Sequence, residues 1–140
     1  MVAQRSVHSR WDGGLRAVVQ AGDHELIVDE PESVQGGTNR GPQPTDLLLA
    51  AVASCFTLSI AYSAGKHRME IADVHVDVTG VYDGPQFQAI RIAVRAAAPG
   101  GADLARRVES AKRVCDVTRT LALGPELTVV IEEGAGGDGA

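Results

Sequence analysis

Apolar residues gather in one long block and several shorter runs along this chain. The long block, LLLAAVASCFTLSIAYSA at residues 47–64, contains no charged residue over eighteen positions and ends at Gly65. Pro44 and Asp46 before it suit the first turn of a helix, and Lys66 after it suits the last turn. The block therefore predicts a helix of about twenty residues, apolar on nearly every side and buried in the protein core.

The same block reaches the usual length of a membrane span, but its many alanines and serines make it only weakly apolar. The helix-terminating residues at both ends favour a core helix of a soluble protein, so no membrane partner is expected. The N-terminal residues MVAQRSVHSRW lack the apolar stretch of a secretory signal. We therefore expect a cytoplasmic protein.

The shorter runs predict strands and a second helix. Arg10–Pro31 alternates between glycine turns and predicts a three-stranded meander. Val74–Asp83 and Phe87–Ala98 predict a hairpin, and Leu127–Glu132 predicts a last strand. Residues 102–121 predict an amphipathic helix, whose apolar positions at helical spacing are Leu104, Val108, Ala111 and Cys115.

This order of elements predicts an α+β fold in a single domain, residues 1–140, with a flexible tail at 133–140. A helix that is apolar on all sides needs more cover than one sheet and one other helix of a small monomer provide. A second subunit would supply that cover, so the pattern also predicts an oligomer.

Charge and motif content exclude several function classes. The chain has 13 Lys plus Arg against 18 Asp plus Glu, a formal charge of −5, so nucleic acid is a poor partner. Its four histidines are scattered and it has no C-x-x-C or H-x-x-x-H pattern, so no metal site is expected. A P-loop lysine and a G-x-S-x-G elbow are also missing.

The two cysteines, Cys55 and Cys115, remain as candidates for chemistry. In the cytoplasm they are expected to be reduced, and most lone thiols of this kind are packing residues. Cys55 lies about nine residues inside the apolar helix, where burial raises a thiol pKa. Its reactivity would therefore require a cation from another part of the molecule.

A longer motif surrounds the first cysteine. The run GGTNRGPQPTDLLLAAVASC at residues 36–55, followed sixty positions later by Cys115 in AKRVCDVTRTL, resembles the OsmC/Ohr family of thiol-dependent organic hydroperoxide reductases. The resemblance spans roughly residues 8–133. It implies an OsmC-like fold, in which antiparallel sheets wrap around long central helices in an intertwined homodimer.

The resemblance also implies roles for individual residues. Cys55 takes the place of the thiol that attacks the peroxide, and Cys115 that of the resolving thiol, which forms a disulfide with the Cys55 sulfenic acid. An external dithiol such as a lipoyl group would reduce that disulfide, and no bound cofactor is implied. The activating arginine matches Arg16 best, with Arg10 as the second choice.

One position departs from the family pattern. Ten residues before the reactive cysteine, where well-studied members have a glutamate that holds the arginine, this chain has Thr45. Asp46 is the adjacent carboxylate and becomes the candidate for that role. An apolar mouth that includes Leu48, Phe56 and Tyr62 would favour organic hydroperoxides over hydrogen peroxide.

Two functions follow from these observations. The first is a two-cysteine peroxidase that reduces alkyl or lipid hydroperoxides in an oxidative stress response, which the presence of both cysteines favours. The alternative is a catalytically weak dimer of the same fold that binds an apolar small molecule or serves as a stress-associated protein. The threonine at position 45 favours this second reading.

Overall fold

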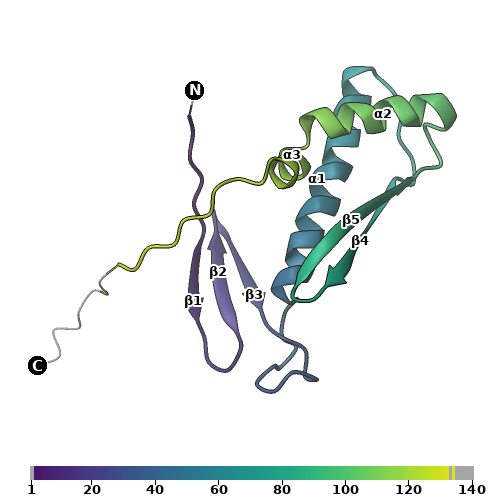
Figure 1. Cartoon of the computed structure of the whole chain (residues 1–140). Helices are drawn as coiled ribbons and strands as arrows, with labels where there is room; N and C mark the ends of the chain where they lie inside the picture. The colour runs from purple at the N-terminus through teal and green to yellow at the C-terminus, as the bar shows by residue number, and fades with distance from the viewer. Residues whose placement is uncertain (1, 133, 135–140) are drawn as a thin grey trace, which may run out of the picture.

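The computed structural model describes residues 2–132 and 134, so the predicted tail at 133–140 lies outside the described residues except for Gly134. The elements follow one another as three strands, a long helix, two strands and two shorter helices. Figure 1 shows the three strands on one side of the molecule and the other elements gathered around the long helix. The α+β fold predicted from the pattern is confirmed.

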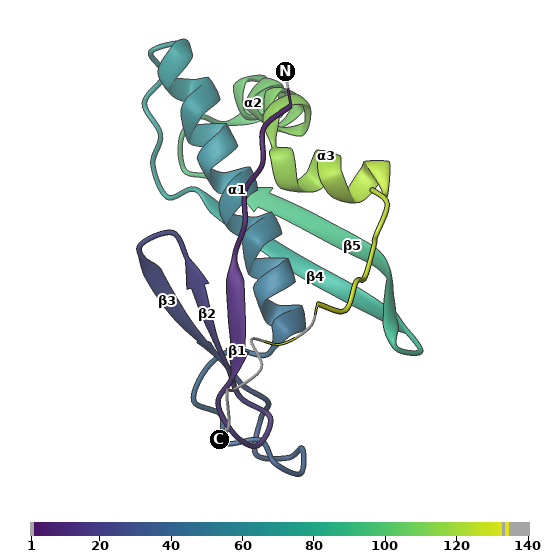
Figure 2. The same ribbon diagram turned by 90° about the vertical axis from the view of Figure 1, so that its left-hand side faces the viewer.

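The N-terminal sheet is the predicted meander. Strands β1 (His8–Trp11), β2 (Ala17–Ala21) and β3 (His24–Val28) pair antiparallel in that order. A glycine at position 22, with φ of +59°, makes the tight turn between β2 and β3. The sheet makes only marginal contact with the helices and the second sheet. It projects from the rest of the chain, as both views show (Figures 1 and 2).

The predicted apolar helix is α1 (Pro44–Lys66), with its proline at the start and its lysine in the last turn. It packs against α2, α3 and strand β4. The face on these elements is buried, with Val52, Phe56, Ile60 and Ala64 at its centre. Another face stays exposed: Leu58 is 69% and Tyr62 60% accessible. The expectation of a helix buried on all sides is therefore not met within one chain.

By length and composition, α1 would also pass for a membrane span. Core helices of soluble proteins pass the same test, so this single helix is weak evidence for a membrane protein. One face of α1 is packed against protein in this structure, as a core helix requires.

Strands β4 (His75–Asp83) and β5 (Gln86–Arg95) form the predicted hairpin. The hairpin lies along α1, opposite the N-terminal sheet (Figure 2). The core between it and the helices is built on Phe56, Ile60, Ala111 and Cys115. Valines and isoleucines of the hairpin pack against this cluster, because alternate residues of each strand face the helices.

The predicted second helix is instead two helices, α2 (Gly101–Val114) and α3 (Asp116–Leu123). Cys115 separates them because its backbone is extended, with φ of −73° and ψ of 105°. The Arg119 guanidinium donates a hydrogen bond to the Arg113 carbonyl, near the end of α2. Asp116 suits the first turn of α3, where the helix dipole favours a carboxylate. The prediction of one continuous helix is wrong.

The predicted last strand, Leu127–Glu132, is not a strand in this structure. Its apolar side chains are among the most exposed of the molecule, with Leu127 at 91% and Ile131 at 99%. A strand needs a neighbouring strand to satisfy its backbone hydrogen bonds, and no sheet edge of the described residues accepts this segment.

Candidate active site

The two cysteines meet although sixty positions separate them in the chain. Cys55 comes from the middle of α1 and Cys115 from the junction of α2 and α3, two helices that pack on α1. Cys55 packs against the buried cluster that contains Cys115, each thiol affects the pKa of the other, and both are free. Cys115 is completely buried, whereas Cys55 is partly accessible. Two reduced thiols in contact form the chemical centre of this half of the molecule.

The break between α2 and α3 places a helix N-terminus at these sulfur atoms. The backbone N–H of Val117 favours the ionised form of both thiols, and the backbone N–H and hydroxyl of Thr118 favour that of Cys115. The Thr118 hydroxyl also donates a hydrogen bond to the Cys115 carbonyl oxygen at 3.3 Å. N–H groups of a first helical turn have no partner within the helix and favour an anion. In a continuous helix, these N–H groups would instead donate hydrogen bonds to carbonyl groups of the same helix.

The pKa values of the two thiols move in opposite directions. Burial raises the pKa of Cys55, and the neighbouring Cys115 adds to the increase, although Val117 and Ser59 oppose it with hydrogen bonds. Burial also acts to raise the pKa of Cys115, but the hydrogen bonds from Thr118 prevail and that pKa is lowered. No cation contributes to the pKa shift of either thiol. Within one chain, Cys55 is therefore the harder thiol to ionise.

A shallow cavity of about 480 Å³ opens beside Cys55. Two of the three predicted substrate residues lie on this face of α1, because Leu48 and Tyr62 are each seven residues, or two helical turns, from the cysteine. Tyr62 lines the cavity together with Leu58. Both side chains are exposed, so the face around the thiol is apolar and lacks a cover in the single chain.

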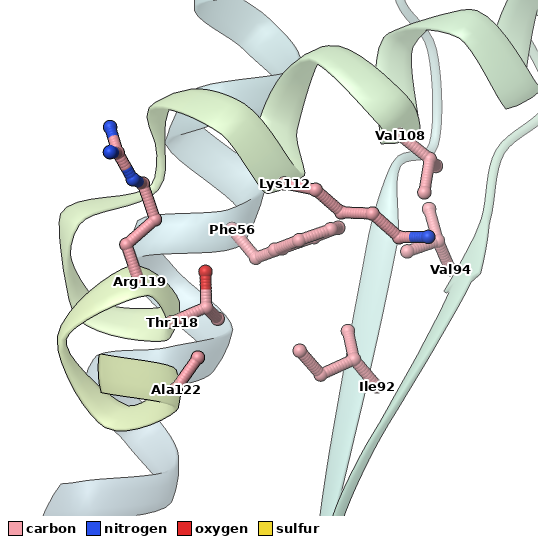
Figure 3. A pocket seen from close by; sticks show the side chains of 8 residues that line it. All are labelled: Phe56, Ile92, Val94, Val108, Lys112, Thr118, Arg119 and Ala122. Atoms are coloured by element: carbon pink, nitrogen blue, oxygen red, sulfur yellow. The ribbon is translucent and has the colours of Figure 1, made fainter. Parts of the chain in front are cut away.

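Phe56, the third predicted substrate residue, faces a different cavity. This second cavity, of about 320 Å³, lies between α1, β5, α2 and α3. Figure 3 shows the phenyl ring at its centre, with the Lys112 side chain crossing toward Val94 and the Arg119 guanidinium pointing away from the ring. Its lining residues are Phe56, Ile92, Val94, Val108, Lys112, Thr118, Arg119 and Ala122.

Arg16, the predicted activating cation, lies in the turn before β2. Its guanidinium Nε is 3.0 Å from a carboxylate oxygen of Asp12, and its Nη1 is 3.4 Å from the Thr38 hydroxyl. The second candidate, Arg10, contacts the same carboxylate at 3.0 Å. These bonds hold the pKa of Asp12 below its usual value, chiefly through Arg16. The structure thus places both arginines in the N-terminal sheet region, away from the two thiols.

The predicted carboxylate partner, Asp46, is exposed in the first turn of α1. Among the described residues it forms no ion pair with Arg16 or any other cation. Asp12 makes that contact instead. The sequence signal that could have indicated this pairing is an aspartate four residues before an arginine, across a glycine turn.

Sequence reasoning also missed Asp29, which directly follows β3 and is only 1% accessible. Its carboxylate accepts hydrogen bonds from the Thr38 hydroxyl and from the backbone N–H groups of Glu30, Thr38 and Arg40. The Thr38 hydroxyl is the main cause that lowers the pKa of Asp29 to about 2, with the backbone bonds adding to it. A single carboxylate thus organises the glycine-rich loop that leads to α1.

The described residues contain no cluster of side chains that could bind a metal ion. Across residues 2–132, no three His, Cys, Asp or Glu side chains lie together as a metal site would require. The chemistry available is that of two thiols, an apolar surface and an arginine held elsewhere in the chain.

Comparison with known proteins identifies the fold. The family model described as OsmC-like protein matches residues 37–130. An OsmC-like protein from Mycoplasma pneumoniae has a TM-score of 0.76 at 15% identity, covering 87% of this chain and 89% of its own. The organic hydroperoxide resistance protein OhrB of Bacillus subtilis has a TM-score of 0.56 at 18% identity, covering 84% and 90%.

A third solved structure is the organic hydroperoxide resistance protein OsmC of Legionella pneumophila. It has a TM-score of 0.60 at 16% identity and covers 86% of this chain and 90% of its own. At these identities the structural likeness establishes the fold alone. No curated protein sequence matches the chain.

Proposed function

The chain belongs to the OsmC-like family, and from this premise we propose that it is a two-cysteine peroxidase that reduces organic hydroperoxides. The observation that carries the proposal is the contact between Cys55 and Cys115. Two free thiols from distant parts of the sequence that pack together in one cluster suit a disulfide that forms and breaks during turnover.

The proposed reaction has three steps. The Cys55 thiolate attacks the terminal oxygen of the hydroperoxide, so the O–O bond breaks, the sulfur becomes a sulfenic acid, and the alkoxide takes up a proton to leave as an alcohol. The Cys115 thiolate then attacks the Cys55 sulfur, so the disulfide forms, the S–O bond breaks, and the hydroxide takes up a proton to leave as water. A dithiol such as a lipoyl group returns both cysteines to thiols by exchange and is itself oxidised.

The surroundings of Cys115 support its resolving role. A resolving thiol must be ionised and need not meet the hydroperoxide, because its substrate is the neighbouring sulfur. Cys115 is fully buried and has a lowered pKa because of Thr118. Cys55 is the accessible thiol of the pair and lines an apolar cavity, which suits contact with an organic hydroperoxide.

The first step needs a cation at Cys55, and we propose that Arg16 of a second copy provides it. A guanidinium within about 4 Å favours a thiolate and stabilises the departing alkoxide. In its own chain, Arg16 is bonded to Asp12 and Thr38 in a projecting sheet. An intertwined homodimer would bring that sheet to the partner's α1 and would cover Leu58 and Tyr62. It would also offer a sheet edge to residues 127–132.

The location and the reductant belong to the same proposal. A catalytic disulfide that must be reduced in every cycle suits the cytoplasm, where thiols are kept reduced. The proposed mechanism uses no cofactor bound to the chain, so an external dithiol supplies the electrons that reduce the disulfide.

The alternative function is a dimer that binds an apolar small molecule and has little peroxidase activity. The cavity around Phe56 favours it, because 320 Å³ with a mainly apolar lining is within the lower size range of small-molecule sites. The raised pKa of Cys55, caused by burial, favours it as well.

Titration with cumene hydroperoxide separates the two functions. The peroxidase loses both thiols together at one equivalent of oxidant, and mass spectrometry of the denatured protein finds a Cys55–Cys115 disulfide. A binding protein keeps Cys55 reduced at a modest excess of oxidant. A faster reaction with cumene hydroperoxide than with hydrogen peroxide is expected from the apolar face around Cys55, and the reverse preference would remove the role of that face.

A further inference from the structure

The guanidinium of Arg16 is fixed on two of its edges. Its Nε donates to the Asp12 carboxylate at 3.0 Å, its Nη2 to the Asp12 carbonyl at 3.1 Å, and its Nη1 to the Thr38 hydroxyl at 3.4 Å. An arginine side chain has five N–H donors, so two remain, one on each terminal nitrogen. These two N–H groups lie in the guanidinium plane and can donate to an anion at the remaining edge of the group.

Asp12 is itself held in place. Its backbone N–H donates to the Arg16 carbonyl at 2.9 Å, and the Arg16 N–H donates to the Gly13 carbonyl at 3.0 Å, so the two residues close a tight turn. Arg10 contacts the other carboxylate oxygen of Asp12 at 3.0 Å. The carboxylate therefore has little freedom to move away from Arg16.

The second anchor is also rigid. The Thr38 hydroxyl donates a hydrogen bond to Asp29, whose carboxylate is buried at the end of β3. The hydroxyl therefore keeps its oxygen available to accept from Arg16. Arg16 and Asp29 line one cavity, to which Trp11, Leu15 and Val34 contribute apolar atoms.

We propose that Asp12 is the positioning residue that aims the Arg16 guanidinium at the thiolate of Cys55 in the second copy of the chain. This inference rests on the proposed function, which assigns Arg16 to that thiolate. Asp46, the carboxylate expected from the sequence for this task, is exposed in the first turn of α1. The strongest of the Arg16 contacts, a charge-assisted bond from Nε, is to Asp12.

The two possible roles of Asp12 predict opposite changes in the pKa of Cys55 when its charge is removed. As a negative charge near the site, Asp12 disfavours a thiolate, so its removal alone lowers the pKa of Cys55 and speeds its reactions. As the residue that orients Arg16, its removal misdirects the cation, which raises the pKa and slows the reactions. The two effects are opposite, and only positioning makes Asp12→Asn slower than the parent.

The test uses the whole chain with Cys115→Ser, so that Cys55 is the one thiol that iodoacetamide can alkylate. We expect Asp12→Asn to slow alkylation at pH 7 by about tenfold and to move the midpoint of the pH–rate profile upward. Asp77→Asn is the matched control, because Asp77 pairs with Arg95 at 3.7 Å on an exposed strand of the other sheet. Its alkylation rate should equal that of the parent.

A double-mutant cycle keeps the test valid if Asp12→Asn also perturbs the turn. If Asp12 acts through Arg16, Asp12→Asn causes no further slowing of alkylation in an Arg16→Ala background. An unchanged or faster rate in Asp12→Asn, or effects of the two substitutions that add, would overturn the positioning role. Alkylation needs no peroxide, so failure of the wild type to form the disulfide with cumene hydroperoxide would refute the peroxidase function separately.

Discussion

The helical region and the N-terminal sheet region each hold one half of the proposed thiol-activating site. The helical region brings Cys55 and Cys115 together and supplies backbone donors from α3. The sheet region holds Arg16 in a fixed orientation with two donors unused. Each half is ordered by contacts within its own region, yet they do not meet in one chain. Under the proposed function, their separation means that assembly of two chains, rather than local folding, completes the site.

The two regions hold complementary parts of the proposed site, a cation and a nucleophile. In the sheet region, carboxylates are stabilised in their ionised form by arginine and by hydrogen bonds, which lowers the pKa of Asp12 and of Asp29. In the helical region, burial raises the pKa of Cys55, and no cation opposes it. The region with the spare cation donors thus lacks the nucleophile, and the region with the nucleophile lacks the cation.

The largest expected effect comes from mixing two inactive variants, which tests whether the cation and the thiol come from different subunits. Cys55→Ser removes the nucleophile and Arg16→Ala removes the cation, and we expect each to lower the peroxidase rate by about a hundredfold or more. If the site is shared between subunits, a mixed dimer contains one complete site. Random reassociation then restores about a quarter of the wild-type rate, because half of the dimers carry one working site of two.

The control for this mixture is a pair of chains that carry Cys55→Ser and Cys115→Ser. Both cysteines come from the same chain in the described contact, so their mixture should regain no disulfide-forming site. Recovery in this control, or none in the first mixture, would show that the cation and thiols are not distributed as proposed.

The exposed face of α1 offers the next largest effect. Leu58 is 69% accessible in the single chain and borders the Cys55 cavity. If the partner covers this face, Leu58→Glu buries an unpaired charge and should shift gel filtration from dimer to monomer, with a loss of peroxidase activity of at least about tenfold. Thr79→Glu adds the same charge on the exposed outer face of β4 and should leave the dimer intact. A dimeric Leu58→Glu variant would place the interface elsewhere.

Much of the fold was predictable because local patterns decide it. The period of two in the strands, the glycine turns and the long uncharged block correctly indicated the meander, the hairpin and α1. The order of these elements was enough to predict the α+β class. The family followed from residues 36–55 and the second cysteine, and the family match to residues 37–130 confirms it.

The details of the site depend on contacts between distant residues and were less predictable. The spacing of Leu104, Val108 and Ala111 continues smoothly to Cys115, so nothing in the periodicity marks the break there. The break depends on tertiary packing, since α3 turns back onto α1 and brings its first-turn N–H groups to the thiols. The pairing of Arg16 with Asp12 instead of Asp46 likewise depends on a turn whose shape the sequence does not specify.

Acid should separate the stability of the two regions. The pKa of Asp29 is lowered from 3.8 to about 2, mainly by the Thr38 hydroxyl. Because the folded-state pKa lies below the unfolded value, this carboxylate stabilises the fold above about pH 4, and that stabilisation is lost as pH falls toward 2. Asp29→Asn should lower the thermal unfolding midpoint by several degrees at pH 7 and remove this part of the acid dependence.

Circular dichroism at several pH values measures both effects, with Asp77→Asn as the exposed control that should change neither. An acid dependence of Asp29→Asn equal to that of the wild type would mean that another carboxylate dominates. In that case, the ordered loop before α1 would not depend on Asp29 for its stability.

The smallest expected effect concerns the donors around Cys115. Thr118→Val removes the hydroxyl that helps to lower the pKa of this thiol, so the pKa should rise and the thiolate fraction at neutral pH should fall. A more basic thiolate is also a better nucleophile, which recovers part of the loss. For a tenfold loss of thiolate, the net decrease in the rate of disulfide formation is about threefold.

Stopped-flow measurement after one equivalent of cumene hydroperoxide separates this step from the first, because sulfenic acid formation at Cys55 should keep its wild-type rate. Thr120→Val is the matched control: its hydroxyl bonds the Asp116 carbonyl at 2.6 Å and contributes nothing to the pKa of Cys115. A slower first step in Thr118→Val with an unchanged second step would assign the α3 donors to Cys55 instead. The helical region would then activate the attacking thiol itself, and the need for a cation from the sheet region would be correspondingly smaller.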